Sequence, residues 1–169
     1  MNSKQTILGI GALILVVMLF AWFARPDGGG RSTASIGDQV SGDQALTAEE
    51  RMFNFGTISM ARGEVRHAFK VKNSFSEPMT INKIYTSCMC TTAYLVRVGS
   101  KLGPYGMPGH GIVPRIDEKF APGEEAEVEV VFDPAAHGPA GVGRVDRAVY
   151  LENDKGMPLE LGFTVMVTP

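Results

Sequence analysis

A strict alternation of apolar and other residues is the feature that most constrains how this chain of 169 residues folds. In the segment PLELGFTVMVTP, residues 158–169, every second residue from Leu159 to Val167 is apolar. Because successive side chains of a β-strand point to opposite faces, a period of two predicts a strand with one buried face. The same period recurs in EVRHAFKVK, residues 64–72, and in EAEVEVVFDP, residues 125–134. We therefore expect three half-buried strands.

Four further segments have the composition of short strands. They are MFNFG (52–56), MTINKIYTS (79–87), TTAYLVRV (91–98) and RAVYLEN (147–153). Turn-forming stretches such as SFSEP, APGE and ENDKGMP separate the strands, and no long helical period occurs after residue 50. About seven short strands at this spacing predict an all-β fold, an immunoglobulin-like antiparallel β-sandwich, over residues 51–169.

The amino-terminal segment differs from the rest of the chain because residues 7–24 contain no charged or strongly polar side chain. This run has about the length that crosses roughly 30 Å of hydrocarbon at 1.5 Å per residue. The alternative is a cleaved signal peptide, whose apolar region covers about 7–15 residues and ends in an A-x-A-like site. Trp22 lies two positions before Ala24 and fits such a site poorly. We therefore interpret residues 1–24 as an uncleaved transmembrane helix.

Residues 25–50, RPDGGGRSTASIGDQVSGDQALTAEE, are rich in Gly, Ser and Asp and lack a period. This composition buries too little apolar surface to offset the entropy of ordering, so we expect a flexible linker. Cationic residues flank the apolar run on both sides and do not settle its orientation. Because nearly the whole chain follows the helix, we expect a single-pass protein of the cell membrane with its domain on the extracytoplasmic side.

Several stretches resemble successive blocks of a bacterial family of domains of unknown function, numbered fifteen-seventy-three. These stretches are FNFGTI, GEVRHAFKVKNSFSEPMTINKIYTSCMCTT, FAPGEEAEVEVVFDP and RAVYLENDKGMPLELGFTVMV. They resemble the family's F-D-F-G-x-I, T-F-x-F-x-N-x-G-x-x-P-L, T-S-C-x-C-T and A-P-G-E blocks and its S-N-D-P-like last turn. The resemblance covers residues 52–167 and implies an exported immunoglobulin-like sandwich without an agreed activity.

Two features depart from the family's pattern. Met89 occupies the position between the cysteines, where a small residue is usual. The segment 96–120, VRVGSKLGPYGMPGHGIVPRIDEKF, is longer than the expected connection and rich in Gly and Pro. Long loops of this kind are uncommon unless they are functional or mobile.

The two cysteines of the chain, Cys88 and Cys90, are candidate metal ligands. At the end of an extended strand their side chains would point to the same face. Copper(I) and zinc both favour thiolate ligands, and copper(I) also accepts thioether sulfur. The stretch GMPGH offers Met107 and His110, and AAHGP offers His137. The candidate site therefore contains Cys88, Cys90, Met107, His110 and His137, with copper(I) as its candidate ion.

Two other interpretations of the cysteine pair remain open. Free cysteines are often buried, so Cys88 and Cys90 could pack against the opposing sheet. A disulfide between them would close a very small ring, which would be strained and easily reduced, as in a thiol redox protein.

Composition and motifs narrow the function classes. A formal net charge of -2 and the lack of a basic stretch argue against nucleic-acid binding. The sequence contains no G-x-S-x-G, G-x-x-x-x-G-K-S/T or H-E-x-x-H motif, so we expect no enzyme. The expected function is a non-catalytic interaction or structural module, with the membrane and an unknown protein as partners. The alternatives are copper(I) handling and thiol redox chemistry.

Overall fold

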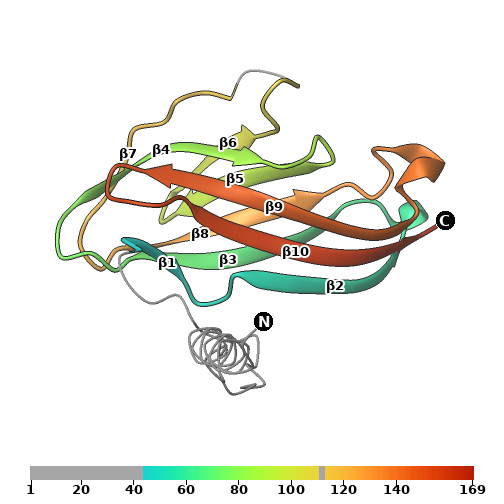
Figure 1. Ribbon diagram of the computed structural model, residues 1–169, viewed down its shortest axis with the longest axis horizontal. Coiled ribbons are helices and arrows are strands. Elements are labelled where there is room, and N and C mark those ends of the chain that lie inside the picture. Colours follow the sequence, from blue (N-terminus) through green and yellow to red (C-terminus); the bar gives the residue numbers. More distant parts are fainter. Residues whose placement is uncertain (1–43, 111–112) are drawn as a thin grey trace, which may run out of the picture. The chain divides into compact units, whose positions relative to one another are not determined.

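The protein's two β-sheets form a sandwich, which the computed structural model describes over residues 44–110 and 113–169 (Figure 1). Within these residues one sheet contains, in spatial order, β1 (Leu46–Ala48), β3 (Val65–Asn73), β8 (Glu125–Phe132), β5 (Thr91–Arg97) and β6 (Ser100–Tyr105). The other sheet contains β2 (Met52–Ser59), β10 (Leu159–Thr168), β9 (Gly143–Asn153), β4 (Met79–Thr86) and β7 (Glu118–Phe120). Two short 3-10 helices connect strands, η1 (Met60–Arg62) and η2 (Gly138–Gly141).

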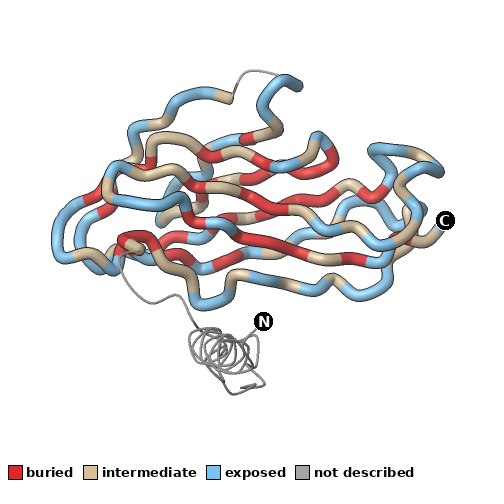
Figure 2. Tube along the Cα trace, viewed as in Figure 1, coloured by how far each residue is buried: buried red, intermediate tan, exposed pale blue. Residues whose placement is uncertain are grey.

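The predicted alternation is confirmed on the three strands that carry it. Along β10, Leu159, Leu161, Phe163, Val165 and Val167 are all at most 1% exposed. On β8 the residues from Glu125 to Val130 alternate in the same way, with the buried Ala126, Val128 and Val130 between more exposed glutamates, whereas Val131 and Phe132 are both buried. Strand β3 buries its carboxyl-terminal half by the same rule. The buried residues run along the strand centres (Figure 2).

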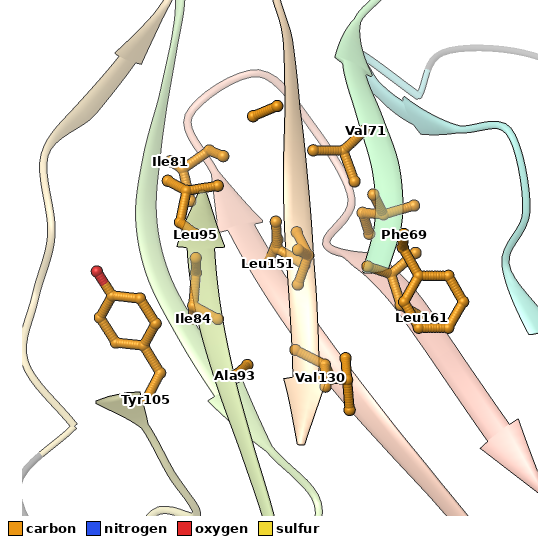
Figure 3. Close-up of a cluster of buried hydrophobic side chains, with 14 of the residues drawn as sticks. Phe69, Val71, Ile81, Ile84, Ala93, Leu95, Tyr105, Val130, Leu151 and Leu161 are labelled. Carbon is orange, nitrogen blue, oxygen red and sulfur yellow. The ribbon is translucent and has the colours of Figure 1, made fainter. Parts of the chain in front are cut away.

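The core lies between the two sheets. Figure 3 shows its side chains coming from both layers, among them Phe69 of β3, Leu151 of β9 and Leu161 of β10. These side chains are fully buried. Burial of apolar surface on this scale is the main favourable contribution to folding.

The sandwich differs from the expected one in two respects. The described residues form ten strands rather than about seven. Strands β1 and β7 have three residues each, which is too short to show a period of two, and β6 contains Gly103 and Pro104, which disfavour strands. The sandwich is also not purely antiparallel, because β2 pairs in parallel with β10. These two strands come from opposite ends of the domain, so no hairpin turn dictates their relative direction.

The predicted transmembrane helix, residues 1–24, lies outside the described residues, as does the part of the predicted linker before residue 44. In residues 44–110 and 113–169 no helix is long and apolar enough to span a membrane. Strand β1 lies in the last part of the segment assigned to the linker and pairs with β3. Sheet structure thus begins upstream of Arg51.

Candidate metal centre at the β4–β5 turn

The T-S-C-x-C-T motif forms the connection between β4 and β5, and its threonines and serine hold this turn in place. Thr86 and Thr91 are buried, and the Thr86 hydroxyl lies 2.9 Å from the carbonyl oxygen of Cys88 and 3.0 Å from that of Thr91. The Thr91 N–H donates to the Cys88 carbonyl at 3.1 Å. Ser87 forms two hydrogen bonds with the backbone of Ala148 in β9. Its N–H donates to the Ala148 carbonyl, and its Oγ accepts the Ala148 N–H. The motif's polar residues therefore fix the path of the backbone around the cysteines.

The cysteines lie in this turn and not in an extended strand, yet their sulfurs lie within 4.8 Å of each other. The Cys90 N–H donates to Sγ of Cys88 at 3.4 Å. Both are free thiols; Cys90 is buried and Cys88 is half-buried. The intervening Met89 is 51% exposed. Its side chain therefore lies largely at the surface.

The third member of the cluster, His137, comes from the connection between β8 and β9. Its Nε2 lies 3.3 Å from Sγ of Cys88. The register of the sheet explains the meeting, since Thr91 at the start of β5 pairs with Phe132 at the end of β8. The residue before Thr91 and the residues after Phe132 therefore emerge at the same end of the sheet. The Asp133 N–H donates to the Cys90 carbonyl at 2.9 Å and joins the two connections.

The spacing of Cys88, Cys90 and His137 suits a single ion. One ligand atom from each residue lies within 4.8 Å of both others. Metal–ligand distances are about 2.0–2.3 Å, so two ligand atoms on opposite sides of an ion lie roughly 4–4.6 Å apart. The ligand atoms of the three residues are already close to this separation, and small side-chain rotations would bring them into coordination range. His137 is an exposed residue. The cluster is thus a candidate site for a metal that accepts sulfur and nitrogen ligands.

The protonation of the two thiols differs. Burial opposes ionisation of Cys88, but hydrogen bonds from the thiol and N–H of Cys90, from His137 and from Arg147 outweigh it and lower the pKa of Cys88 to about 7. Burial and the neighbouring Cys88 sulfur raise the pKa of Cys90, although Arg147 and Thr91 act in the opposite direction. The pair therefore loses its first proton from Cys88 near neutral pH, and a thiolate is the form that binds metals.

Arg147 of β9 is the functional residue that the sequence analysis missed. It lines one pocket together with Cys90 and His137, and its positive charge acts to lower the pKa of both cysteines. A signal for it exists in the sequence, because Arg147 shares the inward face of β9 with Val145, Val149 and Leu151. A cation in such a position requires an anionic or polar partner inside the protein.

A pocket of about 330 Å³ adjoins the cluster. Its lining includes Cys90, His137, Arg144 and Arg147, with Phe132 and Val145 as apolar walls. The cluster is therefore reachable by small molecules from this side.

The structure brings together three of the five predicted ligands, Cys88, Cys90 and His137. Met107 and His110 lie in the turn after β6, where the His110 N–H donates to the Met107 carbonyl at 3.2 Å. The imidazole of His110 is exposed. In Figure 1 the segment that follows β6 lies at the top of the view, whereas η2 lies at the right. His137 directly precedes η2 in the chain.

Together, the fold and the cluster define an all-β sandwich with a Cys-Cys-His group at one end of its sheets. Residues 46–102 match the sequence model of a family described as a protein of unknown function, DUF1573. This match confirms the resemblance inferred from the motifs as far as residue 102, and it includes the complete T-S-C-x-C-T turn; the A-P-G-E block and the last turn lie outside the matched residues. No curated protein shows significant sequence similarity to the chain.

Among solved structures, one similar chain is a protein of unknown function from Porphyromonas gingivalis W83, with a TM-score of 0.53 and 10% identity. The similarity covers 72% of this chain and 46% of the Porphyromonas chain, so it spans about half of that protein. The PapD-like domain 7 of human CEP192 has a TM-score of 0.46 at 11% identity, covering 82% of this chain and 97% of that one. The YadV chaperone has a TM-score of 0.45 at 8% identity, covering 75% and 53%. The Porphyromonas structure supports the sandwich fold and nothing beyond it.

Proposed function

We propose that this protein is a non-catalytic, immunoglobulin-like module that binds one soft metal ion, copper(I), through Cys88, Cys90 and His137. The observation that carries the proposal is the convergence of the two sulfurs and the imidazole within 4.8 Å of one another. The proposal narrows the wider expectation of an interaction or structural module by giving the module a ligand.

The donor set favours copper(I) over other common ions. Thiolate sulfur and imidazole nitrogen suit soft and borderline ions, whereas calcium and magnesium require oxygen ligands. Structural zinc sites almost always have four protein ligands, and three side chains of the described part of the chain converge here. Copper(I) binds with fewer ligands and accepts thiolate readily.

The location of the module is part of the same proposal. Residues 7–24 would anchor the chain in the cell membrane, and residues 25–43 would connect the anchor to the sandwich. The domain would then face the extracytoplasmic side and meet its ion and an unknown protein partner there.

A copper(I) competition experiment tests the metal-binding function. The reduced, detergent-solubilised full chain is titrated anaerobically against a chromophoric copper(I) chelator. We expect about one ion per chain, because the three ligands surround a single position. Binding should release protons, since the thiols must ionise to coordinate.

The variants Cys88→Ser and Cys90→Ser should each abolish tight binding, and His137→Asn should weaken it. His110→Asn is the matched control, because it changes an exposed histidine outside the Cys88–Cys90–His137 cluster. Stoichiometric binding that survives both cysteine replacements would refute the proposed function. An effect of His110→Asn equal to that of His137→Asn would refute the ligand assignment.

One observation favours thiol–disulfide exchange as a second candidate function, namely the lowered pKa of Cys88 beside the raised pKa of Cys90. The Cys88 thiolate would attack a substrate disulfide, bond to one of its sulfurs and release the other as a thiolate. Cys90, after losing its proton to solvent, would then displace the bound sulfur and leave a Cys88–Cys90 disulfide. Incubation with glutathione disulfide distinguishes this function, because it predicts a glutathione adduct on Cys88 in Cys90→Ser. The absence of that adduct at pH 8 would count against it.

A further inference from the structure

Arg147 places a positive charge in the pocket that Cys90 and His137 also line, and its environment differs from that of the neighbouring arginine. Its side chain is half-buried, and Nη1 donates to the Asp146 carbonyl at 2.7 Å. Arg144, three residues earlier in β9, also lines the pocket, but it is exposed and forms an ion pair with the Asp146 carboxylate, 3.1 Å from its Nε. Because Arg144 is already paired and solvated, Arg147 is the cation that acts on the sulfurs.

The Nε of Arg147 supports this relation independently. This atom is buried and has no hydrogen-bond partner among the described residues. A buried N–H without an acceptor costs free energy, and a thiolate is a far better acceptor than a neutral thiol. A negative charge on the neighbouring sulfurs would offset part of this cost through its electrostatic attraction to the guanidinium.

A charge count then separates monovalent from divalent ions. Two thiolates and a neutral imidazole around a monovalent ion carry a net charge of about -1, which the Arg147 guanidinium neutralises. The same ligands around a divalent ion are neutral, so Arg147 would leave an excess positive charge next to that ion. Solvent screens this interaction less than one at the surface, because Cys90 is buried and Arg147 is half-buried. Asp133 lines the same pocket, but its carboxylate accepts the Ala135 N–H at 2.8 Å.

We infer that Arg147 makes the Cys88–Cys90–His137 site selective for a monovalent soft cation over a divalent one. The inference rests on the proposed function, because it assumes that the cluster binds metal. Arg147 acts through the ligands and is not itself a ligand. It is a residue that determines which ion binds.

The test compares silver(I), an air-stable monovalent probe, with zinc(II) on the reduced, detergent-solubilised full chain. Apparent affinities for both ions are measured by competition for the wild type, Arg147→Gln and Arg147→Lys. We expect Arg147→Gln to lower the ratio of silver(I) to zinc(II) affinity at least about tenfold, because it removes the charge. Arg147→Lys should retain most of the wild-type ratio, because it keeps the charge and loses only the planar fork. Arg144→Gln is the matched control and should change the ratio by less than about twofold, since its charge is exposed and paired.

The outcomes separate the inference from the proposed function. If the wild type binds neither ion, the proposed function itself fails. If it binds silver(I) and Arg147→Gln weakens both ions equally, Arg147 only shapes the site and the inference is wrong. Loss of the preference in Arg147→Lys as well would show that charge is not the cause.

A second measurement covers the case in which Arg147→Gln does not fold. Arg147→Met in the full chain removes the charge and keeps an unbranched side chain that packs on the apolar walls of the pocket. The wild-type ratio of silver(I) to zinc(II) affinity should exceed that of Arg147→Met at least about tenfold. An Arg147→Met chain with the same ratio as the wild type would overturn the inference.

Discussion

The Sγ atom of Cys88 lies 3.3 Å from Nε2 of His137, although the two residues are 49 positions apart in the chain. Strand pairing produces this contact, because β5 begins opposite the end of β8. The cysteines precede β5 and the histidine follows β8, so both are placed at one end of the same sheet. The site is thus a consequence of the sandwich's register and not of local sequence alone.

The first prediction concerns the reactivity of Cys88. Its lowered pKa of about 7 means that the thiol is mostly protonated below that pH and mostly thiolate above it. We expect the rate of alkylation by iodoacetamide at Cys88, followed by mass spectrometry, to rise with a midpoint near pH 7. His137→Asn should move the midpoint upward, because it removes one of the donors that favours the thiolate. A midpoint near the ordinary value of 9.0 in the wild type would contradict this prediction.

The second prediction concerns Asn73, a fully buried polar residue at the end of β3. Its Nδ2 lies 3.0–3.1 Å from the carbonyl oxygens of Glu77, Phe120 and Ala121, and its Oδ1 accepts the Phe75 N–H at 2.9 Å. Replacement by Leu leaves these buried backbone groups without their partner. We expect Asn73→Leu to lower the free energy of unfolding by about 3 kcal/mol, measured by urea denaturation.

Asn54→Ala is the control for Asn73→Leu. Asn54 is exposed, and its side chain accepts one N–H, from Gly56, at 2.8 Å. Its loss should cost no more than about 1 kcal/mol. Equal losses in the two variants would show that the network around Asn73 does not stabilise the fold.

The sandwich was predictable because the alternation of buried and exposed residues repeats along individual strands. Each of β3, β8 and β10 contains enough alternating residues to define a buried face. The short β1 and β7 contain too few, and the parallel pairing of β2 with β10 depends on contacts between distant segments. Local periodicity therefore predicts strands and their faces but not their partners.

The candidate site was predictable only in part, for the same reason. Residue chemistry identified Cys88, Cys90 and His137, but it could not separate His137 from His110. That separation depends on the pairing of β5 with β8, which no short motif encodes. Arg147 was missed because a single arginine in an otherwise apolar strand face interrupts the alternation at one position and does not by itself indicate a functional residue.

The third prediction tests the assignment of faces. Phe163 of β10 is 1% exposed and contacts Phe55 and Phe132 at ring-centroid distances of 5.3 Å. Phe163→Ala should leave a cavity and lower the free energy of unfolding by about 3–5 kcal/mol. Glu127 of β8 is exposed, so Glu127→Ala should change this free energy by no more than about 0.5 kcal/mol. Chemical denaturation of both variants checks the result, and similar losses would mean that the faces are wrongly assigned.

The fourth prediction tests the amino-terminal anchor. The uncharged run of residues 7–24 predicts that the full chain stays with membranes after washing with alkaline carbonate. A chain that begins at residue 25 should be released into the soluble fraction, because it lacks the only apolar run of this length in the sequence. Fractionation and immunoblotting of the two chains provide the measurement. A mature protein that starts near Arg25 in cells would instead identify the segment as a cleaved signal peptide.

The last prediction tests on which side of the membrane the sandwich lies. Nearly all of the chain follows the apolar run, so we expect the linker and the domain on the extracytoplasmic side. A reporter Ser35→Cys, in a Cys88→Ser and Cys90→Ser background, places a single thiol in the predicted linker. A membrane-impermeant maleimide should label this thiol in intact cells whose outer barrier has been removed. A cytoplasmic protein with an accessible cysteine serves as the control and should be labelled only after lysis. If Ser35→Cys is also labelled only after lysis, the domain faces the cytoplasm, where abundant reduced thiols would compete with Cys88 and Cys90 for copper(I).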